Sequence, residues 1–215
     1  MAANQNIRLH QIFQELKDKN LIEKERRLVQ TRFTLQMQGV SFLKKIRYNK
    51  SFYENYLTKL DDDILRFILL HEEGHIKNGS SVPYYIIAIV SILFLLLFWY
   101  PFNYGLFNSL IFILIFFPLS YRFLYISLRK EEFKADEFAA ISMKNGYNIF
   151  DSTELLRNMF QKVDEITTQN NQKSPFSMLL LIFIILIGFF PDYHPAPCER
   201  IANVKKMVLV SNNTD

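Results

Sequence analysis

The stretch that decides the fold is LDDDILRFILLHEEGHI, residues 60–76, which contains the motif HEEGH. Three acids, Asp61 to Asp63, precede a long apolar run, and carboxylates at this position favour the positive end of a helix dipole. The run is apolar on more than one face, so the helix should be buried in protein or lie against lipid. On this helix His71 and His75 stand four residues apart and share one face, where both imidazoles can reach the same ion.

The residue order within HEEGH indicates a particular kind of metal site. A hydrolytic zinc site uses three protein ligands and leaves the fourth position to water, whose pKa the ion lowers towards neutrality. Glu72 follows the first histidine and can take a proton from that water without binding the ion, as in HExxH. The alternative is a pair of solvated histidines on an acidic helix. Because the chain has only four histidines, a chance match is rare, and we favour zinc.

Two long apolar segments follow the motif. The chain is 50% hydrophobic and holds 21 Phe and 11 Tyr, more than is usual for a soluble protein of 215 residues. Residues 82–100 and 106–126 each approach the length needed to cross hydrocarbon, and the turn PFNYG separates them. We predict a transmembrane hairpin over 82–126, with the lipid bilayer as a partner. The alternative, a hairpin buried in a soluble core, would leave a small protein with two long apolar helices to cover.

A hairpin returns the chain to the side that it left, so the segments before and after it can form one site. The short turn has no Lys or Arg whereas both other flanks are basic, and the positive-inside rule places those flanks in the cytoplasm. The single cysteine, Cys198, excludes an internal disulfide and is typical of a reducing compartment. We therefore expect an integral membrane protein whose active site faces the cytoplasm.

The segment after the hairpin, RKEEFKADEFAA at 129–140, offers carboxylates at helical spacing. Glu132 and Asp136 are four residues apart, so one could bind zinc while the other orients a ligand by a hydrogen bond. Glu131 and Glu137 are rival carboxylates. Taken alone, the run is also typical of a solvated, charged helix that leaves a membrane. Together with HEEGH it favours a metal site.

Three motifs occur in a characteristic order: HEEGH, then EFKAD after the hairpin, then YHPAPCERI at 193–201. This order resembles the membrane zinc metallopeptidases of the HtpX and Ste24 group, an M48-type family with HExxH, ExxxD and a late His-Pro followed by Arg-Ile. The resemblance covers about residues 46–204 and implies one zinc ion per chain. The ligands that it implies are His71, His75 and Glu132. It also implies Glu72 as general base and Asp136 as the residue that orients a ligand.

The resemblance further implies that His194 and Arg200 lie near the substrate carbonyl or organise the site. Residues 176–190, FSMLLLIFIILIGFF, precede them and are apolar enough to suggest a third span. A third span would place His194 across about 30 Å of hydrocarbon from the zinc. Because the run is shorter than the usual span of about 17 to 25 residues, we predict a buried, re-entrant or interfacial helix that packs beside the hairpin.

The residues before HEEGH contain no apolar span, and we expect no signal peptide. Residues 1–30 predict an amphipathic helix, which could lie on an anionic membrane surface or cap the domain. TRFTLQMQ at 31–38 alternates apolar and polar residues and predicts a strand, with VSFLKKIRYN at 40–49 as its partner beyond Gly39. In a zinc peptidase such a strand commonly edges the cleft, where an extended substrate can add by main-chain hydrogen bonds.

The sequence thus predicts a mainly α, minor α+β fold: an integral membrane zinc-peptidase domain with an HExxH helix, a transmembrane hairpin and a small edge-strand element. Its predicted parts are the N-terminal helix 1–30, the HEEGH half 31–81, the hairpin 82–126 and the C-terminal half 127–215.

The predicted function is zinc-dependent hydrolysis of peptide bonds in membrane or membrane-proximal proteins at the cytoplasmic face, as in quality control. We expect a protein or peptide substrate and no nucleic acid. A catalytically silent membrane scaffold or chaperone is an alternative, although it would not need Glu72. Processing of prenylated CAAX proteins would need a large multi-span chamber. A transporter would need ionisable residues in its spans, and the first span has none.

Overall fold

The structure is a computed structural model that describes residues 2–32, 37–41, 43–79, 89, 92, 106–170 and 194–212. For residues 2–6, 106–124, 166–170 and 208–212 it describes the backbone alone. In chain order the elements are α1 (Ala2–Asp18), β1 (Arg27–Thr31), β2 (Gln38–Val40), β3 (Lys45–Asn49), α2 (Lys50–Asn55), the 3-10 helix η1 (Leu57–Lys59), α3 (Asp62–Asn78), α6 (Leu106–Tyr147), α7 (Ser152–Asn170) and α9 (Pro197–Asn212).

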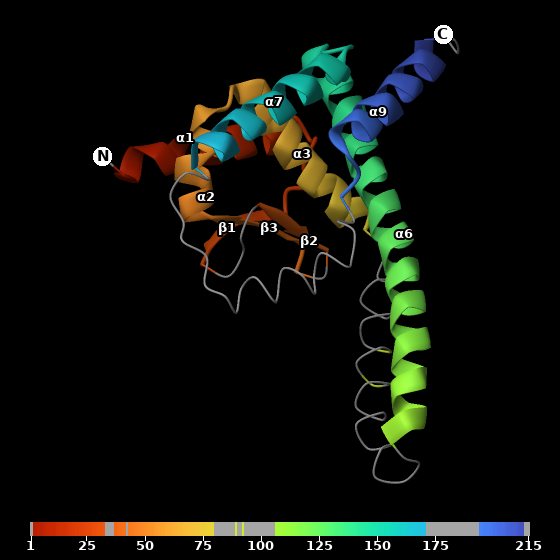
Figure 1. Ribbon diagram of the computed structural model, residues 1–215. Coiled ribbons are helices and arrows are strands. Elements are labelled where there is room, and N and C mark those ends of the chain that lie inside the picture. The colour runs from red at the N-terminus through yellow and green to blue at the C-terminus, as the bar shows by residue number, and fades with distance from the viewer. Residues whose placement is uncertain are drawn as a thin grey trace.

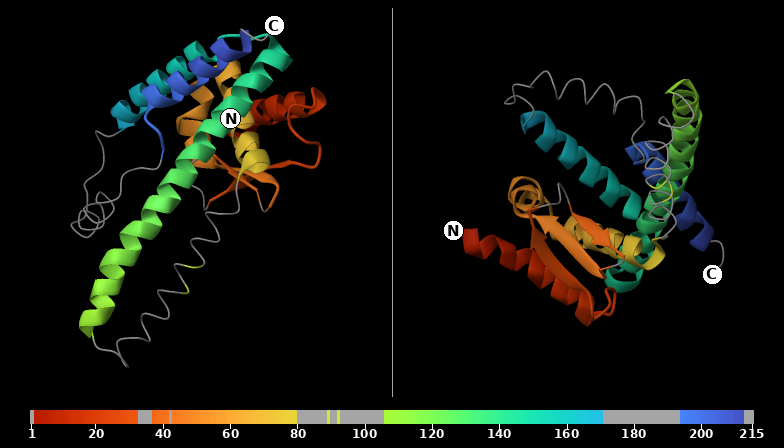
Figure 2. Two further views of the ribbon diagram at one scale, coloured as in Figure 1. Left: turned by 90° about the vertical axis from the view of Figure 1, so that its right-hand side faces the viewer. Right: turned by 90° about the horizontal axis from the view of Figure 1, so that it is seen from below.

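Helices form one layer over a small sheet, and one long helix extends past both (Figure 1). The helices α1, α2, α3 and α7 lie on the same side of the sheet, while the N-terminal half of α6 projects beyond the sheet's other side. The two further views in Figure 2 show the same arrangement. The prediction of a mainly helical fold with a small sheet is confirmed.

The sheet has the order β1-β3-β2, with β1 parallel and β2 antiparallel to the central strand. Along β3 the residues alternate: Ile46 and Tyr48 are buried beneath the helices, whereas Lys45 and Arg47 are only half-buried. This alternation follows from the two-residue period of a strand. The inner face of the sheet therefore belongs to the core, and the outer face carries charge.

The prediction of a single strand over 31–38 is wrong. Thr31 ends β1, and Gln38 begins β2. These two strands run in opposite directions, because one is parallel and the other antiparallel to β3. Arg32 and Met37 belong to neither strand, and residues 33–36 lie outside the described residues. The predicted partner beyond Gly39 is found, since β3 pairs with β2 in an antiparallel register.

The N-terminal helix is shorter than the predicted range 1–30. It ends at Asp18, and Asn20 follows with a φ of 57°, the left-handed conformation that terminates helices. The apolar side chains of α1 are buried in the core: Leu9, Ile12, Phe13 and Leu16. Of the two alternatives, this burial corresponds to a helix that caps the domain.

Helix α3 crosses α6 at very short range. A Cβ built on Gly74, the glycine of HEEGH, would lie 2.8 Å from the Cα of Ala135 in α6. Such a separation is too short for any side chain, so the two backbones meet at a position where only glycine fits. The crossing brings HEEGH next to EFKAD, although Gly74 and Ala135 are 61 positions apart in the sequence.

A buried ion pair holds the other side of α3. The Nε of Arg26, directly before β1, donates to both carboxylate oxygens of Glu73 at 3.2 and 3.0 Å. Glu73 is fully buried and Arg26 is 4% exposed. Burial raises the pKa of Glu73, and Arg26 acts in the opposite direction by stabilising the carboxylate. The pair links the start of the sheet to the helix that carries the histidines.

The predicted membrane segments are described only in part. Residues 106–126 form the N-terminal half of α6, a helix of 42 residues, whereas of residues 82–100 the structure describes Ile89 and Ile92 alone. The apolar run 176–190 lies outside the described residues. Within the described part of the chain, no helix has both the length and the apolarity to cross a membrane.

We expect Arg26→Ala to destabilise the fold, because it leaves the Glu73 carboxylate buried without its main partner. Removing one member of a buried pair typically costs about 3 to 5 kcal/mol. The double variant Arg26→Met with Glu73→Leu should recover most of this loss, since it removes both charges and keeps apolar volume. Urea unfolding followed by circular dichroism measures both. If the single and double variants were equally unstable, the pair would not be the source of the loss.

Candidate metal centre

Three elements that lie far apart in the sequence supply the candidate site. Helix α3 carries His71, Glu72 and His75, and α6 carries Glu132 and Asp136. The third element is α9, which lies against α6 in Figure 1 and is preceded by the short segment that begins at residue 194. The predicted site residues from HEEGH, from EFKAD and from the late His-Pro stretch are thus brought together.

Three donor groups in this site stand at the spacing of metal ligands. The Nε2 atoms of His71 and His75 are 3.0 Å apart. The carboxylate oxygens of Glu132 lie 3.6 Å from His71 Nε2 and 3.3 Å from His75 Nε2. Two ligands bound to one tetrahedral zinc ion at its usual bond lengths are about 3.3 Å apart. The residues present therefore fit a zinc ion, and this group is the candidate metal cluster found among the described residues.

Asp136 orients the first histidine. Its Oδ1 lies 2.9 Å from His71 Nδ1, which can donate its proton to the carboxylate and so leave Nε2 as the donor towards an ion. Arg200 holds Asp136 from behind, with Nε 2.7 Å from Oδ2 and Nη2 2.5 Å from Oδ1. Burial alone would raise the pKa of Asp136, but hydrogen bonds from Arg200 and His71 hold that pKa below its usual value.

Glu132 is the buried carboxylate of the cluster. Burial alone would raise its pKa, but hydrogen bonds from His194, His71 and His75 lower that pKa well below the usual range. The side chain is 6% exposed, so its charge is compensated by these neighbours rather than by water. A carboxylate that stays ionised beside two imidazoles is a suitable third ligand for zinc.

Glu72 lies beside the cluster and is bound to the sheet. Its Oε2 accepts a hydrogen bond from the backbone N–H of Gly39 in β2 at 2.5 Å. Burial raises the pKa of Glu72, so this carboxylate is a stronger proton acceptor than an exposed one. A Cβ on Gly39 would clash with the backbone carbonyl of Glu72. The glycine therefore lets β2 approach α3 closely enough for this bond to form.

The two predicted site residues of the late His-Pro stretch, Arg200 and His194, occupy different positions in the site. Arg200 is 11% exposed and is bound to Asp136, with Nη1 3.6 Å from Glu132, so it organises the ligands. His194 is 43% exposed, and its Nδ1 lies 3.4 Å from Glu132 Oε1. This places His194 at the solvent-facing edge of the site, where it can meet a substrate. Both residues therefore lie beside the cluster that the histidines of HEEGH form with Glu132.

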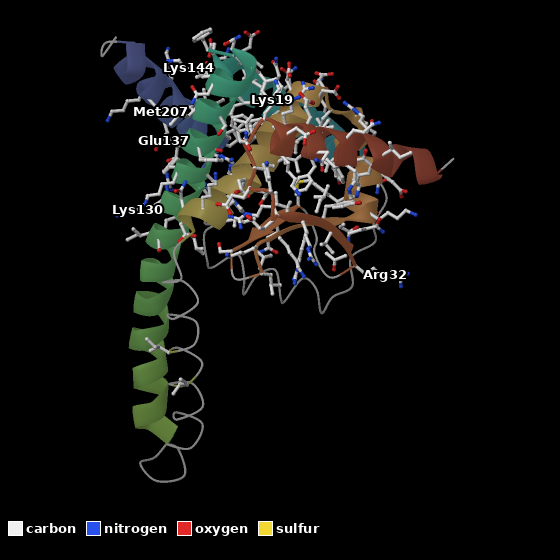
Figure 3. All side chains as sticks on the ribbon, turned by 180° about the vertical axis from the view of Figure 1, so that it is seen from behind. Lys19, Arg32, Lys130, Glu137, Lys144 and Met207 are labelled. Carbon is white, nitrogen blue, oxygen red and sulfur yellow. The ribbon has the colours of Figure 1, made fainter. Side chains whose placement is uncertain are left out.

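The rival carboxylates are not part of the cluster. Glu137 is exposed, and Figure 3 shows it on the outer side of α6. Glu131 is half-buried and does not belong to the group of donor atoms formed by the two histidines and Glu132. The helical spacing explains the difference, because Glu131 is rotated about 100° around the helix axis from Glu132, and Glu137 by the same angle from Asp136.

Two contacts with α3, one from β2 and one from the residue that follows it, have no signal in the sequence. The sequence marks Gly39 only as a break between strands, yet its N–H binds Glu72. The hydroxyl of Ser41 donates to the carbonyl of His75 at 2.9 Å. Both contacts join positions more than 30 residues apart, and no local pattern marks either residue.

The site combines three metal-ligating groups with a buried carboxylate, as a metal-dependent hydrolase requires. Comparison with known families agrees: the sequence model of Peptidase family M48 matches residues 37–208. The chain belongs to this family, whose members are peptidases that generally depend on zinc. No curated protein and no solved structure matches the chain.

We expect Glu132→Ala to lose most of the bound zinc, because only two of the three donors remain. Glu131→Ala and Glu137→Ala are matched controls on the same helix and should retain it. Metal content of the purified proteins, measured by mass spectrometry, compares the three. Equal zinc in all three variants would reject Glu132 as a ligand.

Proposed function

We propose that this chain is an HtpX-like zinc-dependent endopeptidase that cleaves membrane or membrane-proximal proteins at the cytoplasmic face. The observation that carries the proposal is the position of Glu72, a buried carboxylate beside three donors that have the spacing of zinc ligands. A scaffold that had lost activity would not need a base at this position. The membership in family M48 supports peptide hydrolysis as the reaction.

Each side chain of the site would have its own role in hydrolysis. A zinc ion held by His71, His75 and Glu132 would supply Lewis acidity at the scissile carbonyl and at the attacking water. Glu72 takes the proton of that water and later delivers it to the leaving amine. The N–H of Gly39 holds one oxygen of Glu72 and so fixes the side chain, and the other oxygen can accept the proton. His194, at the exposed edge, can donate a hydrogen bond to the developing oxyanion.

The edge strand β2 offers a place for an extended substrate. It is an outer strand of the described sheet, and Gly39 within it contacts the backbone of Glu72. A peptide that paired with the outer edge of β2 would run past the metal centre, with its main chain held by hydrogen bonds. Main-chain recognition of this kind accepts many sequences, which suits an enzyme that removes diverse proteins.

Two observations support placement in a membrane. The sequences 82–100 and 106–126 are apolar over the length of a span, and the second lies in the half of α6 that projects beyond the sheet (Figure 1). In addition, His194 and Arg200 contact the acids of α6. This proximity supports a segment 176–190 that returns to the side from which it came. The absence of basic residues in the turn of the hairpin supports a cytoplasmic site.

We expect Glu72→Gln to keep its zinc and lose turnover by a factor of about 10² to 10⁴, the usual contribution of a general base. Glu137→Gln is the matched control, since that carboxylate is exposed on α6. Cleavage of casein and of an unfolded membrane protein, with and without chelator, measures activity. Wild-type turnover in Glu72→Gln would exclude this mechanism. A chain with full zinc and no chelator-sensitive cleavage of any protein would be a silent scaffold instead.

We expect both ends of the chain to face the cytoplasm. Single reporter cysteines at Ala3 and Asn213, in a Cys198→Ser background, should label from the same side of sealed vesicles, and one at Asn103 in the turn should label from the other. Membrane-impermeant maleimides report the side. Opposite labelling of Ala3 and Asn213 would demonstrate a third span. It would also contradict the contact between His194 and Glu132.

A further inference from the structure

The outer face of the sheet is basic. Arg27 pairs with Lys45 and Val29 with Arg47, and paired residues of neighbouring strands point to the same side. Since Ile46 between them is buried in the core, these side chains point away from the helices. The remaining outer positions of the three strands are Val or uncharged polar residues: Val29, Thr31, Gln38, Val40 and Asn49. No acid stands at any of them.

Two further cations lie at the ends of these strands. Arg32 follows β1 and Lys44 precedes β3, and both are exposed. Figure 3 shows Arg32 at the edge of the domain on the side of the sheet. We name the five cations the basic sheet face: Arg27, Arg32, Lys44, Lys45 and Arg47.

The charges of the basic sheet face have no acidic partners among the described residues. Several cations on the helices do form ion pairs, as Arg8 does with Asp62 and Lys162 with Asp61. None of the five cations forms an ion pair with another residue that the structure describes. A cluster of unpaired like charges repels itself, and an anionic partner would relieve that repulsion.

The basic sheet face lies on the side of the domain from which the N-terminal half of α6 projects (Figure 1), and this position suggests its partner. In Figure 1 the sheet lies at the end of the domain from which the N-terminal half of α6 projects, and the view from below in Figure 2 looks onto the sheet. The inference rests on the proposed membrane placement of 106–126. If that half of α6 lies in a bilayer, the basic sheet face is turned towards the bilayer surface. Leu43, which is 36% exposed, stands next to Lys44 at the same edge.

We propose that the basic sheet face docks on the anionic lipid headgroups beside the hairpin. Such attraction falls off within a Debye length, about 10 Å at 0.1 M salt, so the face must lie at the lipid surface for it to act. Docking would hold β2, and with it Gly39 and Glu72, close to the bilayer. Protein segments that emerge from the membrane would then meet the edge strand first. The lipid composition would thereby affect cleavage of membrane-proximal sites.

The test uses the full chain in lipid nanodiscs. In a Cys198→Ser background, Leu43→Cys carries a fluorescent dye, and a fraction of the lipids carries a nitroxide on the headgroup. We expect quenching in discs with 30% phosphatidylglycerol to be at least twofold stronger than in discs of phosphatidylcholine alone. About 1 M salt should remove the difference, because the Debye length falls to about 3 Å.

Two charge-reversal variants localise the effect. Arg27→Glu with Arg32→Glu should abolish the extra quenching in anionic discs. The control, Lys205→Glu with Lys206→Glu, makes the same change in net charge on exposed residues of α9, which lies at the opposite end of the domain from the sheet (Figure 1). Equal quenching in both lipids, or equal loss in both variants, would overturn the proposal.

The same preparation separates this inference from the proposed function. Failure of the chain to remain in the discs during gel filtration would overturn both the membrane placement and the docking. A chain that stays in the discs and cleaves casein, but shows no lipid-dependent quenching, would overturn the docking alone. A dye that responds to an oligonucleotide or to polyglutamate, and not to anionic lipid, would assign the face to an anionic macromolecule instead.

Discussion

The close crossing of α3 and α6 is the constraint on which the rest of the site depends. At Gly74 the two helices approach so nearly that a Cβ would come within 2.8 Å of the Cα of Ala135. Ala135 lies between Glu132 and Asp136 on α6, and Gly74 lies between the histidines on α3. The crossing therefore places donor groups of both helices within one ion's reach. A bulkier residue at either position would separate them, since backbone cannot be compressed.

The crossing has an electrostatic requirement, because it buries several charged groups. Glu132 and Asp136 are nearly inaccessible to water, and a buried carboxylate without partners is strongly unfavourable. The structure meets the requirement by connecting them: Arg200 is bound to Asp136, Asp136 to His71, and His71 and His75 to Glu132. On the other side of α3 the pair of Arg26 and Glu73 has the same effect. The metal helix is therefore held by charge on two sides as well as by apolar packing.

The motifs could be recognised from the sequence because they are local. Histidines four residues apart on a helix, and the same interval between Glu132 and Asp136, predict which side chains share a face without knowledge of the fold. The sequence could not decide between Glu132 and its neighbours except by resemblance, nor between the two roles left open for Arg200. It also predicted one strand where two strands of opposite direction occur, because alternation reports which residues are strand-like but says nothing of pairing.

What the sequence by itself determined is the set of chemical groups: the helix with HEEGH, the carboxylates at helical spacing, the apolar segments and the late His-Pro stretch. Each follows from periodicity or from a short motif. Only the tertiary structure decided which groups meet. The bond from Gly39 to Glu72, the position of Arg200 on Asp136 and the pairing of Arg27 with Lys45 all join distant positions. Such contacts depend on how the elements pack, and packing is a property of the whole chain.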